Sequence, residues 1–343
     1  MHRGMIGGLT AALLAAAQVS LAWAQSPADF YKGKTVEMQI GYSPGASGYD
    51  VYARLIARYL GNHIPGNPTV VPKNVEGAGS LRLANYLYNA APKDGTVIGT
   101  IGRGVPFDPL LGNKAAQFDA SKYTWIGSAN DEVSVCVAWQ GTGITKFEDL
   151  YTKQMTVGGT GGGSDTDVFP QILNGLFGTK MKLISGYPGG NDIGLAMERG
   201  EVQGRCGWSW SSVKATRQDW VDQKKVTILV QLSLAKHPDL PNVPLITDLA
   251  KNDEQKQILK LIFARQVMGR PYLAPPGVPN DRVQALRTAF LETMKDPEFV
   301  AAADKGKLEI TPVSGADIDK LVREVYQTPA AVAAKAAELL AVK

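Results

Sequence analysis

Two glycine-rich stretches carry the residue types that could do chemistry. "GYSPGASGYD" covers residues 41–50 and "GGTGGGSDTD" covers residues 158–167, and each follows a strand-like run and leads into a helical pattern. At a helix start several backbone N–H groups have no partner within the helix, and the helix dipole adds partial positive charge. Such a turn can hold a phosphate or a carboxylate without a basic side chain. We therefore expect an anion site at these stretches.

Nucleotide binding does not fit either stretch. A P-loop needs the pattern GxxxxGK[ST], and neither stretch has that lysine. The second stretch offers spacings like GxGxxG only because it is dense in glycine. No acidic residue follows about twenty positions later, as a dinucleotide site would require. Nucleotide binding is therefore disfavoured, and a small anion, either a phosphate or a carboxylate, remains the expected ligand.

Catalytic motifs are sparse. After residue 24 the only imidazoles are those of His63 and His237, and neither GxSxG nor HExxH occurs. No His–Cys or His–Asp cluster has the spacing of metal ligands. The acids are scattered, which leaves a two-carboxylate glycosidase open. We predict a binding protein that is not an enzyme and uses no cofactor or metal.

The first glycine stretch lies in a run of alternating strands and helices. Strands are expected at 35–42, 69–75 and 96–102, and helices at 50–60 and 80–90. Strand, helix, strand, helix, strand is the order typical of a parallel sheet with crossover helices. This order predicts an α/β domain.

The pattern starts again in a second half and then changes. Further strand-like runs are VSVCVAW (133–139), QMTVGG, MKLISGY, EVQGRCGW and VTILVQLS. Residues 263–279 are strand-like and end in a proline-rich turn, and helices are expected at 280–295 and 315–340. We predict one domain from residues 25–130 and 268–343 and another from residues 131–267. The chain would cross between them at 133–139 and 263–272, which makes a hinge around a cleft.

The first residues predict export. A short basic start precedes the apolar run Ile6–Ala17, and Ala22-Trp23-Ala24 fits a small-x-small cleavage site. A membrane anchor is the alternative, but about twelve strongly apolar residues are too few to span a bilayer. We predict a signal peptide at 1–24 and a periplasmic protein.

The net charge of the chain limits the kinds of partner that it could bind. The chain has 36 Lys and Arg against 32 Asp and Glu, and loss of Arg3 with the signal peptide would leave a net charge near +3. That balance argues against nucleic acid as a partner.

The two cysteines, Cys136 and Cys206, lie in strand-like runs. Export permits a disulfide, but two buried free thiols fit equally well.

Several ordered motifs resemble the periplasmic solute receptors of tripartite tricarboxylate transporters, the Bug-type receptors. The similar segments are YKGKTVEMQIGYSPGASGYDVYARLIARYL, VVPKNVEGAGSLRLANYLYNAAPKDGTVIG, YPGGNDIGLAMERGEVQG, LPNVPLITDL and LAPPGVPNDRVQALRTAF. They extend over essentially the whole chain after residue 24. The resemblance implies a two-domain α/β periplasmic-binding-protein fold of type II character. Each domain would hold a mostly parallel sheet flanked by helices, with crossing strands as the hinge.

The resemblance also implies a ligand site between the two glycine stretches. A small carboxylate would be held there by backbone amides and bridging water. The residues implied to bind it are Tyr42, Ser43, Ala46, Ser47, Asp50, Arg103, Thr160, Gly162, Gly163, Ser164, Asp165, Trp208 and Ser209.

Some of these residues have plain structural alternatives. Asp50 could cap its helix, Arg103 could pair with an acid at the surface, and Trp208 could pack in the core. The sequence departs from the family where Ala46 replaces a glycine and where Pro188 replaces a lysine.

The second stretch departs as well, because it carries Asp165 and Asp167. Acids near the cleft mouth would disfavour a highly charged anion. The ligand could be a monocarboxylate, a dicarboxylate, a tricarboxylate, an aromatic acid or an amino acid.

The function predicted from sequence is that of a monomeric periplasmic solute receptor. It would bind a small organic acid and deliver it to integral-membrane transporter subunits. An exported hydrolase on a similar scaffold and a sensory receptor for the same ligands are the alternatives.

Overall fold

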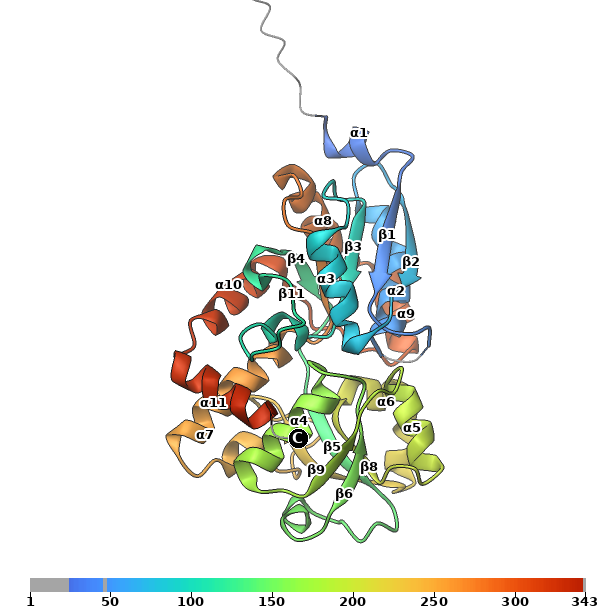
Figure 1. Ribbon diagram of the computed structural model, residues 1–343. Coiled ribbons are helices and arrows are strands. Elements are labelled where there is room, and N and C mark those ends of the chain that lie inside the picture. Colours follow the sequence, from blue (N-terminus) through green and yellow to red (C-terminus); the bar gives the residue numbers. More distant parts are fainter. Residues whose placement is uncertain (1–24, 46–47, 342–343) are drawn as a thin grey trace, which may run out of the picture.

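Two β-sheets, each covered by helices, form two lobes (Figure 1). The computed structural model describes residues 25–45 and 48–341. The predicted signal peptide and the predicted site residues Ala46 and Ser47 lie outside these residues.

The first sheet has the strand order β11-β4-β10-β3-β1-β2. Its strands are β1 (Thr35–Ile40), β2 (Thr69–Asn74), β3 (Val97–Thr100), β4 (Thr124–Ser128), β10 (Pro271–Ala274) and β11 (Val313–Ser314). β1 is parallel to β2 and β3, whereas β10 is antiparallel to β3 and β4. β10 runs the other way because it brings the chain back from the second lobe.

The second sheet has the order β7-β6-β8-β5-β9. Its strands are β5 (Ser134–Trp139), β6 (Met155–Gly158), β7 (Met181–Ile184), β8 (Gly204–Ser209) and β9 (Val226–Leu232). β6 is parallel to β7 and β8, and β5 is antiparallel to β8 and β9. The predicted α/β fold class is confirmed, and the antiparallel members make both sheets mixed.

Helices flank both sheets (Figure 1). They are α1 (Pro27–Tyr31), α2 (Gly48–His63), α3 (Leu81–Asn89), α4 (Asp165–Phe177), α5 (Gly190–Glu198), α6 (Trp210–Asp222), α7 (Asp253–Phe263), α8 (Asn280–Thr293), α9 (Pro297–Lys305), α10 (Gly315–Tyr326) and α11 (Ala330–Ala341). α2 forms because Tyr52, Ile56 and Leu60 recur every four residues and are buried together. α2 and α4 place the two glycine stretches at helix starts, as the sequence predicted.

The two segments that connect the lobes lie side by side. Residues 129–133 carry it outward from β4 to β5, and residues 264–270 carry it back to β10. The amide of Glu132 donates to the carbonyl of Gln266, and the amide of Gly269 donates to the carbonyl of Asn130, each at 2.8 Å. The outward crossing therefore lies just before the predicted segment 133–139, which forms β5 itself.

The C-terminal region differs from its sequence prediction. The single helix expected at 315–340 is two helices, α10 and α11, separated around Pro329. Proline has no N–H and disfavours helical geometry at the residue before it, here Thr328. α11 then packs against α4 and α7 of the second lobe (Figure 1). The predicted domain boundaries stay a prediction, although this helix joins the C-terminal segment to the other lobe.

Cys136 and Cys206 form a disulfide between neighbouring strands β5 and β8. Both side chains are fully buried, and the bond closes a chain separation of 70 residues. A cross-link over such a loop stabilises the fold mainly by restricting the unfolded chain.

We expect loss of this disulfide to lower the free energy of unfolding by about 2–4 kcal/mol. Urea denaturation with and without reductant would measure the change, with the double variant Cys136→Ala/Cys206→Ala as control. Reductant should shift the wild-type transition and leave that of the variant unchanged. A wild-type unfolding transition that reductant does not shift would contradict the expectation.

Candidate functional site

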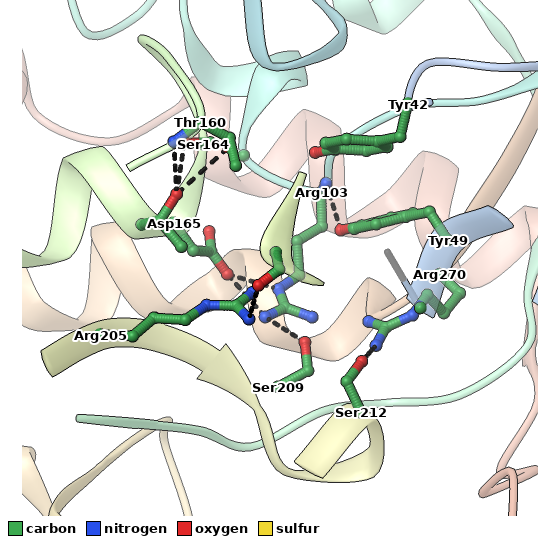
Figure 2. A pocket seen from close by; sticks show the side chains of 16 residues that line it. Tyr42, Tyr49, Arg103, Thr160, Ser164, Asp165, Arg205, Ser209, Ser212 and Arg270 are labelled. Atoms are coloured by element: carbon green, nitrogen blue, oxygen red, sulfur yellow. Dashed lines mark hydrogen bonds and ion pairs between the residues drawn. The ribbon is translucent and has the colours of Figure 1, made fainter. Parts of the chain in front are cut away.

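A cavity of about 50 Å³ lies between the two lobes (Figure 2). Its walls come from the ends of β1, β3, β6 and β8 and from the starts of α2, α4, α5 and α6. Ligands of open α/β sheets commonly bind beyond the carboxyl ends of the strands. The cavity is therefore the candidate functional site.

The structure brings together about half of the site residues predicted from sequence. Those that line the cavity are Tyr42, Arg103, Thr160, Ser164, Asp165 and Ser209. Those that lie elsewhere are Ser43, Asp50, Gly162, Gly163 and Trp208. Tyr49, which the sequence placed beside a possible aromatic ligand, also lines the cavity. Residues that line it and were not predicted include Gly190, Arg205, Ser212 and Arg270.

Arg103 joins the two lobes within the cavity. It follows β3 of the first lobe and is 2% exposed. The alternative that Arg103 pairs with an acid is confirmed by Asp165, but the expected surface location was wrong. Its Nε donates to Asp165 Oδ2 at 2.7 Å, and its Nη2 donates to Ser134 Oγ at 2.7 Å and Ser209 Oγ at 3.2 Å. Burial alone would lower the pKa of the Arg103 guanidinium, but Asp165, Tyr49 and Glu132 together outweigh burial and raise that pKa. The guanidinium is thus permanently charged and mostly occupied by the protein.

Asp165 is held by a second guanidinium. Arg265 lies on the returning crossover, is fully buried and places Nη1 3.4 Å from Asp165 Oδ1. The same nitrogen donates to the carbonyl of Gly163 at 3.4 Å. Asp165, an acid expected to oppose an anionic ligand, is therefore neutralised by the chain itself.

Arg270 forms a separate buried pair at the hinge. Its Nη1 lies 3.3 Å from Glu132 Oε2, and its Nη2 donates to Ser212 Oγ at 2.9 Å. The guanidinium carbon lies 4.7 Å from the centre of the Tyr49 ring and 5.2 Å from that of Tyr52. Arg270 thus positions the aromatic wall of the cavity by cation–π contact.

Arg205, on β8, has no such carboxylate. Its Nη1 donates to the carbonyl of Gly190 at 2.9 Å, and its guanidinium carbon lies 4.8 Å from the centre of the Trp208 ring. Among residues 25–45 and 48–341 no carboxylate oxygen comes within ion-pair distance, and the remaining segments contain no Asp or Glu. Burial lowers the pKa of Arg205 to about 9, with repulsion from Arg270 and Arg103 adding to it. At neutral pH this guanidinium is still charged.

The first glycine stretch is held by Asp50. This carboxylate accepts from the amide of Gly45 at 2.8 Å, from Asn74 Nδ2 at 2.7 Å and from Arg54 Nε at 2.9 Å. Burial alone would raise the pKa of Asp50, but these hydrogen bonds outweigh it and hold the pKa below its usual range. Tyr42, at the start of the stretch, stacks on Tyr49 with ring centres 4.8 Å apart. Asp50 therefore shapes the loop that presents the two tyrosines.

The second glycine stretch is held in the same way by Asp167. Its Oδ2 accepts from the amide of Gly161 and from Ser164 Oγ, each at 2.9 Å. The amide of Thr160 donates to Thr166 Oγ1 at 3.1 Å. Part of the amide array expected to face a ligand is thus occupied within the loop. What remains toward the cavity is chiefly side-chain hydroxyl and guanidinium groups (Figure 2).

Asp108 adds one more carboxylate behind the cavity. It is 3% exposed, lies against Gly163 and accepts from Asn113 Nδ2 at 2.9 Å. Burial raises the pKa of Asp108 to about 6, although Arg265 and Asn113 act against the rise. Around the cavity the guanidinium groups of Arg103, Arg205, Arg265 and Arg270 thus meet the carboxylates of Asp108, Glu132 and Asp165. The charged groups of the site leave one guanidinium uncompensated.

The described part of the chain has neither a candidate metal site nor a candidate membrane-spanning helix. No group of three or more His, Cys, Asp and Glu side chains there could hold a metal ion. None of the helices there has the length and apolar character needed to cross a membrane.

Comparisons with known proteins give structural likeness only. No family model matches the chain, and no curated protein matches it. Among solved structures, periplasmic binding protein BugD is similar, with a TM-score of 0.72 and 19% identity over 89% of this chain and 98% of that one.

Two similar structures hold a carboxylate. One is a Rhodopseudomonas palustris protein with adipate, which has a TM-score of 0.68 and 17% identity over 88% of this chain and 97% of its own. The other is MatC from the same organism with bound malate, with a TM-score of 0.68 and 18% identity over 88% and 99%. These likenesses confirm the expected two-domain periplasmic-binding-protein fold.

Asp108 and Asp50 predict opposite responses to pH. The pKa of Asp108 is raised from 3.8 to about 6 in the folded protein, so between these values the folded state binds more protons than the unfolded state. Its contribution therefore makes the free energy of unfolding fall as pH rises through that window. We expect Asp108→Asn to raise the free energy of unfolding above pH 6 by about 1–3 kcal/mol.

Asp50→Asn is the matched control. The lowered pKa of Asp50 gives stability that is present above its unfolded value and lost as pH falls. This variant should therefore be less stable than wild type at neutral pH. Urea denaturation of both variants across pH 4–8 would measure the effects. If Asp108→Asn and Asp50→Asn destabilise the protein equally at neutral pH, the fold stabilises the ionised form of Asp108, and the prediction is contradicted.

We expect the effects of substituting Arg103 and Asp165 on the free energy of unfolding to be strongly coupled. Asp165→Asn leaves the guanidinium of Arg103 buried without a carboxylate, which typically costs about 3–5 kcal/mol, whereas Arg103→Met leaves Asp165 with Arg265 at 3.4 Å. We expect Arg103→Met and Asp165→Asn to destabilise together by less than the sum of their separate effects, with a coupling above about 1 kcal/mol. The exposed pair of Lys335 and Glu338, with nitrogen and oxygen 2.9 Å apart, is the control and should couple by less than about 1 kcal/mol. Similar coupling in both pairs would contradict a special role for the buried one.

Proposed function

We propose that this protein is a periplasmic solute receptor of the Bug type. In this proposal a small organic acid enters the cavity between the lobes, the lobes close around it, and the complex delivers it to integral-membrane subunits of a tripartite tricarboxylate-type transporter. The receptor acts as a monomer, without turnover, after export by its signal peptide. The two closing units are the domains predicted at residues 25–130 with 268–343 and at residues 131–267.

The observation that carries this proposal is the charge of the cavity. Arg103, Arg265 and Arg270 each have a carboxylate of the chain within 4.0 Å, and Arg205 has none among the described residues. A buried charge without a partner is costly. An anionic ligand would supply the missing partner, and a carboxylate suits a guanidinium because it can accept two parallel N–H bonds.

The remaining walls suit the rest of a small acid. Tyr42 and Tyr49 form a stacked aromatic surface, and Thr160, Ser164 and Ser209 present hydroxyl groups. Cavities with an apolar surface and a few placed polar groups are typical ligand sites. The adipate and malate held by two similar structures are small carboxylates, which supports the same ligand class here.

A thermal-shift panel tests the proposed function. A ligand bound only by the folded state raises the apparent stability by about 2.7 kcal/mol at a hundred times its dissociation constant. We expect at least one acid in a panel of mono-, di-, tricarboxylates and aromatic acids to raise the melting temperature by several degrees. The neutral amide of each acid is the matched control and should have no effect. Stabilisation by sugars or cations, with none by acids, would refute the proposal.

A further inference from the structure

Arg205 is the most unusual charged group in the described part of the molecule. It is 9% exposed, and among residues 25–45 and 48–341 only one of its nitrogens, Nη1, has a hydrogen-bond acceptor. Its Nε is buried and has no acceptor. Figure 2 shows the guanidinium group at the cavity wall, below Asp165 and beside Ser209.

The surrounding backbone is shaped to admit this guanidinium. Gly190 is the first residue of α5, and a Cβ atom there would overlap Nη1, Nη2 and the guanidinium carbon of Arg205. Only glycine lets the helix start approach the group so closely. The Trp208 ring packs on the guanidinium from the same strand. The position of the group is therefore fixed before any ligand arrives.

The other charged groups nearby do not compete for a ligand carboxylate. Arg103 and Arg265 share Asp165, and Arg270 is paired with Glu132. Asp108 lies close to Arg265 and offsets its charge further. Of the four guanidinium groups around the cavity, that of Arg205 is thus the one with no carboxylate of the described residues within 4.0 Å.

Among the described residues that line the cavity, the guanidinium groups other than that of Arg205 already have a carboxylate partner, so a second ligand carboxylate would meet no free cation there. It would lie in a low-dielectric cavity near Asp165, where repulsion between unpaired like charges is strong. The first turns of α2, α4 and α5 already hold Asp50, Asp165 and Asp192, so the helix dipoles there are partly offset. Electrostatics thus favour a ligand with a net charge near minus one.

We propose that Arg205 binds the ligand carboxylate and restricts the receptor to compact acids of net charge minus one. The proposal rests on the proposed function and adds a ligand class to it: monocarboxylates in preference to dicarboxylates and tricarboxylates. In the ligand-free protein the same guanidinium is a source of instability, because it is buried without a counter-ion.

The test compares Arg205→Met with Arg217→Met. Arg217 also lies over a tryptophan, 5.1 Å from the centre of the Trp220 ring, but does not line the cavity. Calorimetric titration would use lactate and benzoate, malate and adipate, and citrate. We expect wild type to bind a monocarboxylate most tightly, Arg205→Met to bind it at least tenfold more weakly, and Arg217→Met to bind it as wild type does.

Thermal unfolding without ligand supplies a second readout. Arg205→Met should unfold at a temperature no lower than wild type, whereas a purely structural arginine would lower it on removal. If Arg205→Met does not fold, that result also counts against the proposal. Arg205→Lys then decides the binding role, since it keeps the charge and should bind the monocarboxylate more weakly than wild type.

The failures of the two proposals are distinct. Wild-type binding of acids that Arg205→Met leaves unchanged would overturn the role of Arg205 and leave the receptor function standing. Tighter wild-type binding of citrate or malate than of any monocarboxylate would overturn the charge restriction. If wild type binds none of the acids, the proposed function fails and the inference fails with it.

Discussion

The cleft depends on one constraint, namely that each buried guanidinium needs a negative partner. Asp165 is shared by Arg103 of the first lobe and Arg265 of the returning crossover. This carboxylate therefore fixes the end of β3, the start of α4 and the hinge relative to one another. The cost of burying so many charges is offset only where pairing and hydrogen bonding are complete, which makes the incompletely paired Arg205 the exception that has to be explained by function.

The glycines of the site serve this arrangement of side chains. A Cβ atom on Gly104 would overlap Arg265, and one on Gly48 would overlap Ser212 and approach Arg270. In the second stretch, Gly163 has a φ of +79° and lies against Asp108, a backbone conformation that other residues rarely adopt. At Gly48, Gly104 and Gly163 glycine is therefore required because polar or charged side chains pack directly on the backbone. Amide donation to an anion is only one part of their role.

Local patterns predicted the fold well, and distant pairings could not be read from sequence. β1, α2, β2, α3 and β3 were found within a few residues because their periodicity is local, and Tyr42, Thr160, Ser164 and Asp165 were found because they lie in the glycine stretches. Arg265 and Arg270 were missed because their partners are remote; Arg265 and Asp165 are 100 residues apart in the chain. Arg205 gave one visible signal, a charged residue inside the strand-like run VQGRCGW. The helix break at Pro329 was also visible, since proline rarely continues a helix.

The positions of the ion pairs and hydrogen bonds determine which of them would break if the lobes separated. Arg270 and Glu132 lie on the two crossovers, which hydrogen-bond to each other, so this pair would stay intact if the lobes separated. Arg103 and Asp165 belong to different lobes and would part, together with the hydrogen bond from Asn191 Nδ2 to the Gly45 carbonyl. Asp165 would then keep Arg265 as its partner, because Arg265 lies on the crossover. Opening therefore exposes Arg103 without leaving a carboxylate unpaired, which keeps its cost below that of breaking an isolated buried pair.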